Sequence, residues 1–516
     1  MSLRLRIVVS AALLVLLSSG VVAMAAEPSG TITWGVHVTL ATRWLDTADT
    51  DAEITPFMVM YALHDALVKP MPGGLNTPSL AESWSMSKDG RTWEFVLRKG
   101  PKFHNGDPVT AEDVKFSFER YKGAAAPLFK DRVREVQVVD ATHVRFQLKE
   151  PWPDFMTFYG TSASGAAYVV PKKYVEKVGE DAYRKAPVGA GPYKFVSFQP
   201  GVELVLEAFD GYWRKTPSVR RLVLRSIPDE STRAAALKRG EVDVAYYFNG
   251  PIADDIRRTP GLTLSPTRTN GVLWVMFPEQ WTPGSPWMDK RVRMAASLAI
   301  DRQAINEAES LGFSGPTGNI VPRHQEFALP IDPDPYDPKR AKALLAEAGY
   351  PNGFDAGEFT PYPPYTSMGE AIANYLAAVG IKTRVRTMER AAFLTAWREK
   401  KLRGVFVGAT GSAGNASTRI EPFATARGVS SYGPIPDVDG LFQRQLQEMD
   451  RKKREEMLHQ IQRLLHERMV FAPIWENGFI RASGPRVEES GLTLIPAFPY
   501  SGPLEDVRLK KEAGPR

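Results

Sequence analysis

The stretch from residue 80 to residue 118 constrains the fold more than any other, because it specifies two different elements in immediate succession. Residues 93–97 alternate large apolar side chains with others, which is the period-2 pattern of a strand with one buried face. Asp89-Gly90 precedes that strand and predicts a tight turn, since glycine accepts a positive φ without steric cost. Thr110, three residues before Asp113, predicts a helix N-cap followed by a carboxylate in the first turn.

Strand and helix patterns alternate along the rest of the chain, which predicts the α/β class. Strands are expected at 31–38, around 144–148 and around 204–206. Cap residues followed by apolar stripes predict helices at 231–240, 289–306, 337–349, 368–380 and 450–468, with Asp301 capping a second short helix. A chain of 516 residues is too long for one core, so we expect two or three domains.

The N-terminus has the pattern of a secretory signal peptide, residues 1–25. Arg4 and Arg6 precede the apolar run 7–17, and Ala23-Met24-Ala25 supplies small residues for cleavage after Ala25. The alternative is a membrane anchor. Since a bilayer-spanning helix needs roughly 20 apolar residues, the short run favours cleavage.

Composition and missing motifs exclude several functions. The chain has no cysteine, which rules out disulfides, thiolate metal sites and thiol nucleophiles. The charge of +6 is spread thinly, and the basic run 451–454 adjoins Glu455 and Glu456 on a predicted helix, so no nucleic-acid partner is expected. The motifs G-x-S-x-G, G-x-x-x-x-G-K and H-E-x-x-H are absent, and the seven histidines lack metal-ligand spacing. We therefore predict no catalytic residues, no metal site and no cofactor; a nickel chelate held through one histidine stays an alternative.

Further blocks follow the opening stretch in a fixed order, up to about residue 385. They are Gly189–Phe195 (with Ala190 where threonine is usual), Phe209–Trp213, Pro228–Arg233, Gly240–Asp243, Val292–Arg302, Tyr336–Tyr350 and Gly380–Lys382. Together with residues 80–118 they resemble the extracytoplasmic solute-binding proteins of peptide, opine and nickel ABC importers (solute-binding protein family 5), which include dipeptide- and oligopeptide-binding proteins. Most of these blocks are folding elements, so the resemblance identifies a scaffold more than a ligand.

The resemblance implies a two-lobed periplasmic binding protein fold of type II, in its large form, with an extra domain inserted in lobe 1. Lobe 1 is expected to combine residues 26–270 with 481–516, and the extra domain about 69–186. Lobe 2 is expected to span 271–480. The chain would cross between the lobes near residue 270 and near 475–482, and two crossings make a hinge that permits closure.

The resemblance also implies a function: a periplasmic substrate-binding component of an ABC importer. Such a protein captures a peptide-like, opine-like or oligosaccharide solute between its lobes and delivers it to the inner-membrane permease with its ATPase subunits. It is expected to be a monomer without enzymatic activity. Gram-positive relatives are anchored by a lipid attached to a cysteine. This chain has no cysteine, so we expect no such anchor. The alternatives are a secreted hydrolase and a periplasmic chaperone or receptor partner.

The segment 404–415 departs from the pattern of the peptide-binding relatives, which commonly carry an aspartate there that neutralises a peptide α-ammonium. Here no carboxylate occurs before Glu421, and Ser412 stands near the aspartate position. An ammonium buried without a counter-charge costs several kcal/mol. We therefore predict that Thr410, Ser412 and Asn415 contact a neutral polyol, an opine-like solute, a phosphorylated sugar or a modified peptide. The alternative is a Gly/Ser loop with no ligand role.

Six further residues are candidates for ligand contact: Thr39, Trp274, Tyr362, Tyr365, Arg386 and Trp475. The two tyrosines lie in a proline-stiffened loop and offer flat surfaces with hydroxyls, although surface aromatics fit equally well. The two tryptophans fall near the expected crossings and either wall the cleft or pack the hinge. Arg386 is suited to bidentate binding of a carboxylate or phosphate, or else to a surface salt bridge. Thr39 offers a hydroxyl after the first strand.

Overall fold

The computed structural model describes residues 27–49, 55–363, 365–411, 414–495 and 497–511. Its largest sheet joins strands from distant parts of the chain. In spatial order they are β10 (Tyr193–Gln199), β11 (Glu203–Ala208), β12 (Val219–Ser226), β1 (Ser29–Val36), β13 (Val244–Tyr246), β19 (Phe471–Ser483), β14 (Thr263–Met276), β18 (Val405–Thr410), β16 (Phe354–Thr360) and β17 (Ile381–Val385), with β15 (Gly315–Pro316) paired to β19 off this path. β1 is parallel to β12 and β13, and β16 is parallel to β17 and β18. The mixed sheet and its helices confirm the predicted α/β class.

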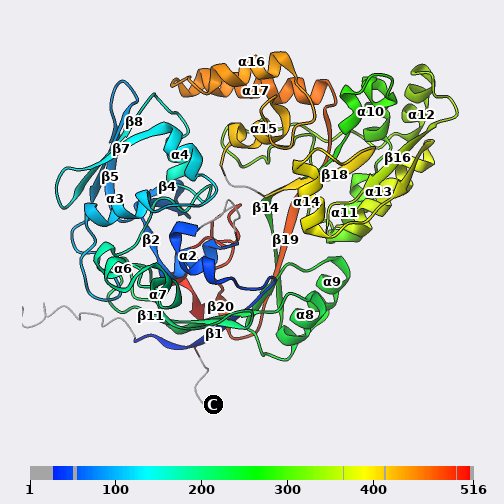
Figure 1. Cartoon of the computed structure of the whole chain (residues 1–516). Coiled ribbons are helices and arrows are strands. Elements are labelled where there is room, and N and C mark those ends of the chain that lie inside the picture. The colour runs from blue at the N-terminus through cyan, green and yellow to red at the C-terminus, as the bar shows by residue number, and fades with distance from the viewer. Residues whose placement is uncertain (1–26, 50–54, 364, 412–413, 496, 512–516) are drawn as a thin grey trace, which may run out of the picture.

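The buried side chains form separate cores towards the two ends of this sheet. One group of clusters draws its side chains from residues 32–256 and 479–507, and two further clusters draw theirs from 272–475; we call the two groups lobe 1 and lobe 2. Lobe 1 contains α2 (Phe57–Leu63), α6 (Lys172–Val178), α7 (Glu180–Lys185), α8 (Glu230–Lys238) and α9 (Gly250–Arg258). Lobe 2 contains α10 (Lys290–Leu298), α11 (Arg302–Ser310), α12 (Pro338–Glu347), α13 (Thr366–Ala378), α14 (Arg390–Arg398), α15 (Ala416–Ala424), α16 (Pro436–Gln445) and α17 (Arg451–Glu467). Figure 1 shows lobe 2 at the upper right, with β14 and β19 between the lobes.

A second, antiparallel sheet stands apart within lobe 1, in the order β5 (Ala81–Met86), β6 (Thr92–Leu97), β8 (His143–Leu148) and β7 (Val133–Val138). The helices α3 (Ala111–Glu119), α4 (Ala126–Arg132) and α5 (Phe155–Tyr159) belong to the same region, and we call residues 81–159 the extra domain. The turn prediction is confirmed, since Gly90 has φ +67°. The cap prediction is also confirmed: the Thr110 backbone N–H donates to Asp113 Oδ2 at 2.9 Å.

Four predicted helix starts in lobe 2 are confirmed by their caps, whereas the helix expected at 368–380 begins at Thr366 without a side-chain cap. The carboxylates of Asp289, Asp301, Asp337 and Asp450 accept hydrogen bonds from first-turn backbone N–H groups. Asp301 thereby divides the expected stretch 289–306 into α10 and α11, because its non-helical backbone ends one helix and its side chain starts the next.

Short elements complete lobe 1. The strand pairs are β2 (Asp65–Ala66) with β9 (Tyr168–Val169), β3 (Val68–Met71) with β4 (Gly74–Pro78), and β20 (Val487–Glu489) with β21 (Arg508–Leu509). Single 3-10 turns in lobe 1 are η1 (Thr42–Leu45), η2 (Thr47–Asp49) and η5 (Leu504–Asp506), and those in lobe 2 are η3 (Pro278–Trp281) and η4 (Pro286–Met288). The C-terminal residues 487–507 add side chains to the core that begins at β1, so both ends of the described chain belong to lobe 1.

His64, directly after α2, is fully buried and held in one protonation state. Its Nε2–H donates to the Leu45 carbonyl at 3.0 Å, whereas Nδ1 has no hydrogen-bond partner among the described residues. A proton added at Nδ1 would be buried without an acceptor. Burial therefore lowers the pKa of His64 from 6.5 to about 4.

This histidine predicts a loss of stability in mild acid. Above pH 6.5 the imidazole is neutral in both the folded and the unfolded chain, so it adds no pH dependence. Between pH 6.5 and about 4 only the unfolded chain takes up the proton, and the free energy of unfolding falls by about 3 kcal/mol in total. Urea unfolding at pH 7.5, 6.0 and 5.0 measures this. In a His64→Gln variant the slope between pH 6.5 and 4.5 should be smaller; an equal slope would contradict the assignment.

Candidate functional site

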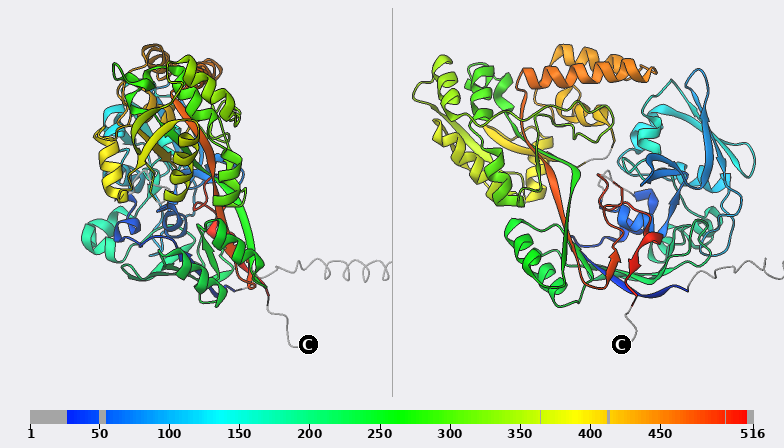
Figure 2. Two further views of the ribbon diagram at one scale, coloured as in Figure 1. Left: turned by 90° about the vertical axis from the view of Figure 1, so that its right-hand side faces the viewer. Right: turned by 180° about the vertical axis from the view of Figure 1, so that it is seen from behind.

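Two long antiparallel strands, β14 and β19, connect the lobes. They pair from Thr263↔Ser483 at the lobe 1 end to Met276↔Phe471 at the lobe 2 end, with a register shift between Arg268 and Val272. Figure 2 shows them from behind as one ribbon between the lobes. Because this ribbon is the hydrogen-bonded connection through the large sheet, side chains beside it lie where the lobes face each other. We call this region the junction.

On the lobe 1 side, three rings form a stack at the junction. His37, just after β1, lies flat against Tyr247, with ring centroids 4.7 Å apart and an interplanar angle of 5°. The other face of His37 lies on Tyr500, at 5.8 Å and 6°. Tyr500 is buried, but Tyr247 is 40% exposed. The stack therefore presents the Tyr247 ring outward.

On the lobe 2 side, two tyrosines face this stack. Tyr362 and Tyr365 stack on each other at 6.3 Å, and the Tyr365 hydroxyl accepts a hydrogen bond from Asn477 Nδ2 at 3.1 Å. Asn477 also accepts a hydrogen bond from Trp475 Nε1 at 2.9 Å. The Tyr247 side chain lies near enough to the Tyr365 hydroxyl to help raise its pKa, so groups from both lobes come together at this point.

The electrostatics of the junction are set by burial and by two cations, Arg233 and Arg390. Burial, followed by repulsion from Arg233 and Arg390, lowers the pKa of His37 from 6.5 to about 3. Burial raises the pKa of the Tyr365 hydroxyl well above its usual range, with Tyr247 contributing next. His37 is thus uncharged at neutral pH. The charge of Arg390, the first residue of α14, acts to lower the pKa of both His37 and Tyr365.

The segment 404–415 is divided between different roles. Thr410 ends β18, and its carbonyl accepts a hydrogen bond from Arg419 at 3.0 Å. Ser412 lies outside the described residues. Asn415 is buried and caps α15, accepting from the Thr418 backbone N–H at 3.2 Å. It also donates from Nδ2 to Asp154 Oδ1 of the extra domain at 2.7 Å, so its side chain is occupied by protein groups.

The other candidates lie in varied surroundings. Trp274 has no exposed surface and packs against Trp397, Phe423 and Phe471, so it occupies the core of lobe 2. Trp475 is also buried, as part of the other lobe 2 core. Arg386 forms an exposed ion pair with Glu358 at 3.0 Å. Thr39 is exposed after β1. The junction thus brings Tyr362, Tyr365 and Trp475 together, with Thr410 paired to Val272 of β14, whereas Trp274, Arg386 and Asn415 are held by other groups.

Sequence reasoning did not single out His37, Tyr247 and Tyr500 for this site. His37 counted only as one of seven scattered histidines, and Tyr500 lies far away in the chain. A usable signal existed at Tyr246-Tyr247, because this pair of aromatic residues stands at the end of the buried strand β13, where the chain enters a loop and functional side chains often gather.

A second contact joins the lobes through the extra domain. Asp154 accepts hydrogen bonds from Arg454 of α17 and from Asn415, and the Asp154 and Arg454 side chains are each only 4% exposed. Arg454 is also held by Gln445 Oε1 at 2.9 Å and lies over the Phe327 ring at 5.3 Å. In Figures 1 and 2, α15 and α17 lie on the side of lobe 2 that faces the extra domain. The lobes therefore touch both at the junction and at this buried ion pair.

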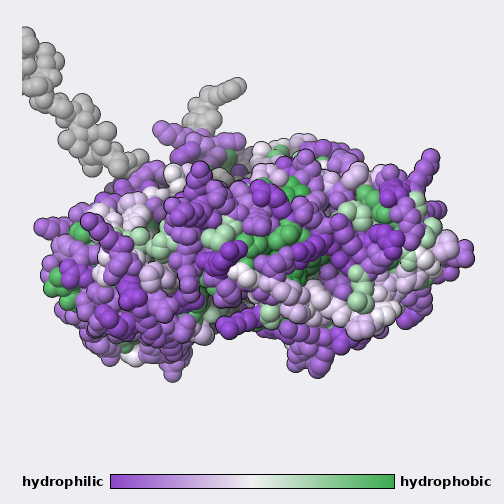
Figure 3. Space-filling model, turned by 90° about the horizontal axis from the view of Figure 1, so that it is seen from above, coloured by the Kyte–Doolittle hydropathy of each residue, from purple (hydrophilic) through white to green (hydrophobic). Residues whose placement is uncertain are grey.

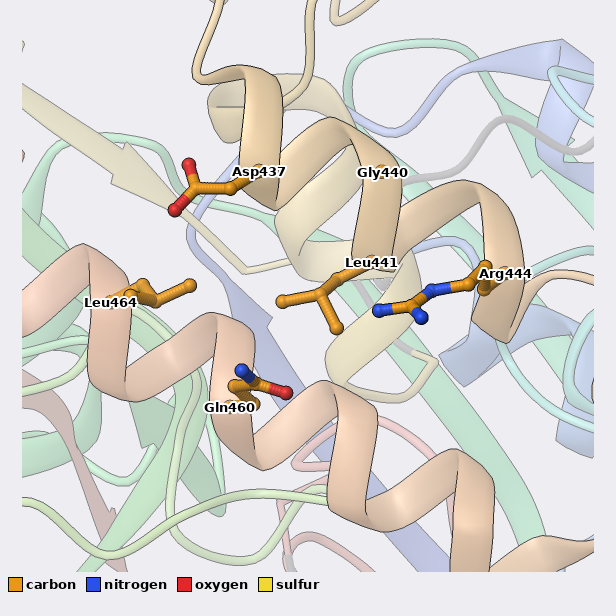
Figure 4. A pocket seen from close by; sticks show the side chains of 6 residues that line it. All are labelled: Asp437, Gly440, Leu441, Arg444, Gln460 and Leu464. Carbon is orange, nitrogen blue, oxygen red and sulfur yellow. The ribbon is translucent and has the colours of Figure 1, made fainter.

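Two surface cavities lie away from the junction. One, of about 620 Å³, adjoins Arg98 and Trp213 in lobe 1. The other, of about 460 Å³, lies between α16 and α17 and is lined by Asp437, Gly440, Leu441, Arg444, Gln460 and Leu464 (Figure 4). Its carboxylate is already paired with Arg468. This cavity offers mainly aliphatic surface and little chemistry.

The part of the chain that the structure describes contains neither a metal-binding cluster nor a membrane-spanning helix. In the described ranges, no cluster of three or more His, Asp or Glu side chains is arranged to hold a metal ion. None of the described helices is long and apolar enough to cross a membrane. Seen from above, hydrophilic side chains cover most of the surface, and hydrophobic residues form small separate groups (Figure 3).

Comparisons with known proteins agree on one relationship. Residues 77–431 match the model of the bacterial extracellular solute-binding proteins, family 5 (middle). The chain is 28% identical over 444 residues to heme-binding protein A of Haemophilus influenzae, covering 80% of this chain and 81% of that one. It is 29% identical over 435 residues to the dipeptide-binding protein of Escherichia coli, covering 76% and 79%. The fold is similar to that of an ABC transporter substrate-binding protein from Listeria monocytogenes, with a TM-score of 0.81, 21% identity, and 94% and 100% of the two chains covered.

Proposed function

The chain belongs to the bacterial extracellular solute-binding proteins of family 5, and from this we propose that it captures a small solute at the junction and delivers it to an ABC importer. The observation that carries the proposal is the meeting of Tyr247 from lobe 1 with Tyr365 and Asn477 beside the connecting ribbon. A solute touching both lobes favours the closed arrangement by its higher affinity for it.

The solute class follows from the relatives and from the charges of the segment 404–415. The relatives are named for heme and for dipeptides, and this segment contains no carboxylate. A buried ammonium would lack a counter-charge there. We infer a peptide-like, opine-like or oligosaccharide solute that does not bury a free ammonium at this place. Tyr362, Tyr365, Thr410 and Ser412 are the proposed contacts from lobe 2.

The setting of the function is part of the same proposal. Residues 1–25 act as a cleaved signal peptide and lie outside the described residues. The mature chain works in the periplasm as a monomer, with an inner-membrane permease and its ATPase subunits as partner. It returns the solute unaltered and catalyses nothing. A secreted hydrolase and a periplasmic chaperone are the competing functions.

The function test is capture of an intact solute. We expect native mass spectrometry of protein incubated with mixed di- and tripeptides, opines and oligosaccharides to show one bound molecule, recovered unchanged after denaturation. Micromolar affinity corresponds to about −8 kcal/mol. Solution scattering should show a smaller radius of gyration with solute than without.

Matched variants sharpen this test. Tyr365→Ala should lower affinity about tenfold, because a stacked aromatic contact and a hydroxyl are lost. Arg384→Ala removes only an exposed ion pair with Asp355 and should leave affinity unchanged. Cleaved products would identify a hydrolase, and preferential binding of an unfolded polypeptide would identify a chaperone.

A further inference from the structure

The cavity of about 620 Å³ in lobe 1 lies where the extra domain meets the segment between β11 and β12. From the extra domain it is lined by Glu82, Arg98, Lys99, Gly100 and Pro101, and from the segment by Trp213. Binding sites for small molecules are commonly concave, measure about 300–1,000 Å³ and lie between domains. The cavity therefore has the size and the position of such a site, and its charged side chains decide what it can bind.

A β-bulge brings an acidic side chain to this cavity. The pairing of β5 with β6 shifts register between Ala81 and Ser83, which makes Glu82 the extra residue of the bulge. Ala81 is buried, whereas Glu82 and Ser83 are both exposed, because a bulge interrupts the regular alternation of side chains. Arg98 directly follows the buried Leu97 of β6 and takes the outer face in turn. Glu82 and Arg98 thus line the same cavity.

The Trp213 ring forms a fixed wall of the cavity. Its Nε1–H donates to Asp65 Oδ2 at 2.8 Å, and Asp65 is a fully buried carboxylate. Asp65 is also paired with the buried Lys69 at 2.8 Å. Because a shift of this carboxylate would leave a buried charge without its partner, the indole ring keeps its orientation. The ring supports the guanidinium of Arg98, whose central carbon lies 4.8 Å from the ring centroid.

The guanidinium of Arg98 is only partly used by the protein. Nε donates to the Ser79 carbonyl at 2.6 Å, whereas its two Nη nitrogens donate to no group among the described residues. Arg214, whose guanidinium lies 5.9 Å from the same ring, is by contrast paired with a carboxylate of η5 at 3.0 Å. In the described part of the chain, neither Arg98 nor Lys99 nor Glu82 takes part in an ion pair. Three charges of both signs therefore face the cavity uncompensated.

These charges select a molecule that carries both signs. A simple anion is repelled by Glu82, and a simple cation is repelled by Arg98 and Lys99. We propose that the cavity is a second binding site, separate from the junction, for a free α-amino acid with an apolar side chain. The two Nη nitrogens of Arg98 hold the carboxylate end-on, with Lys99 beside it, while Glu82 binds the ammonium and the side chain lies on Trp213.

Four probes separate the two charges from the side chain. They are L-leucine, N-acetyl-L-leucine, L-leucinamide and glycine, titrated at millimolar concentrations and followed by fluorine NMR of protein labelled with fluorotryptophan. The Trp213 signal is assigned by its loss in Trp213→Phe. We expect L-leucine to shift this signal and to bind about tenfold more tightly than each other probe. Absence of the shift, or equal binding of any other probe, would overturn the proposal.

Variants test the charged residues one at a time. Arg98→Gln should weaken L-leucine binding about tenfold and bring L-leucine and L-leucinamide to similar affinities. Glu82→Gln should bring L-leucine and N-acetyl-L-leucine together; since Glu82 is exposed, this variant should fold even where Arg98→Gln does not. Lys88→Gln removes an exposed cation elsewhere in the extra domain and should leave affinity unchanged. Unaltered selectivity in Glu82→Gln would contradict the site.

A junction variant distinguishes this site from the proposed function. Tyr365→Ala should weaken capture of the transported solute but leave the L-leucine-induced shift of Trp213 unchanged. Loss of that shift in Tyr365→Ala would assign L-leucine to the junction and refute the second site, while the proposed function would stand. A preserved shift in a protein that captures no solute at the junction would support the second site and refute the proposed function.

Discussion

Gly189→Ala is expected to abolish stable folding of the chain. A Cβ at this position would lie 1.9 Å from the Leu63 carbonyl oxygen and 2.8 Å from His64 Nδ1. Backbone atoms cannot move aside as a flexible side chain can, so the cost exceeds the usual 1–3 kcal/mol of overpacking, and we expect more than about 4 kcal/mol. Soluble yield and thermal unfolding measure it.

The surroundings of Gly189 leave little room for adjustment. Its N–H donates to His104 Nδ1 at 3.2 Å, and the Nε2–H of the same ring donates to the Gly191 carbonyl at 3.0 Å. The Gly191 N–H in turn binds the Leu63 carbonyl at 3.1 Å. The matched control is Gly440→Ala at an exposed position of helix α16, where a Cβ meets nothing within 4 Å and stability should rise by up to about 1 kcal/mol. Equal melting temperatures for both variants would contradict the close approach.

Asp154→Ala is expected to open the molecule without unfolding either lobe. With the lobes in contact, the variant leaves the buried charge of Arg454 without its partner, at a cost of about 3–5 kcal/mol. Separation of the lobes returns that charge to water and removes the cost. Asp154 precedes α5 but makes no side-chain cap bond, so the loss is confined to the interlobe contact.

Spin or fluorophore pairs can measure this opening directly. Because the chain has no cysteine, Met86→Cys on the extra domain and Lys452→Cys on α17 give two unique labels. The distance between them should increase in Asp154→Ala. It should return in Asp154→Leu/Arg454→Met, where both charges are removed. Arg451→Ala breaks an exposed pair within lobe 2, with Glu326 at 3.3 Å, and should leave the distance unchanged. A lower melting temperature with no change in distance would contradict the prediction.

The sequence predicted the local elements well, because their causes are local. A cap, a turn glycine and an apolar stripe act over a few residues, as at Thr110, Gly90 and Asp301. The family resemblance then supplied the α/β two-lobed fold that the comparisons support.

The site residues were harder to predict, because their surroundings depend on contacts between distant segments. Trp274 is buried through its place in a strand whose first half is largely solvent-exposed and whose second half is not. Asn415 looks like any polar loop residue, but its amide meets Asp154, 261 positions away. The orientation of Tyr247 depends on the hydrogen bond from Arg233 to its carbonyl and on a left-handed backbone conformation, which residue propensities do not predict for tyrosine. No periodic pattern encodes such contacts.

The position of β19 in the large sheet also governs when the protein can fold during its synthesis. This strand pairs with β13, β14 and β15, yet it is almost the last element to be made. Residues 487–507, later still, fill the core that starts at β1. The core around β1 therefore stays incomplete, and exposed to proteases and to aggregation, until nearly all 516 residues have been translated. A polypeptide built in this way remains unfolded long enough to be threaded through a narrow pore.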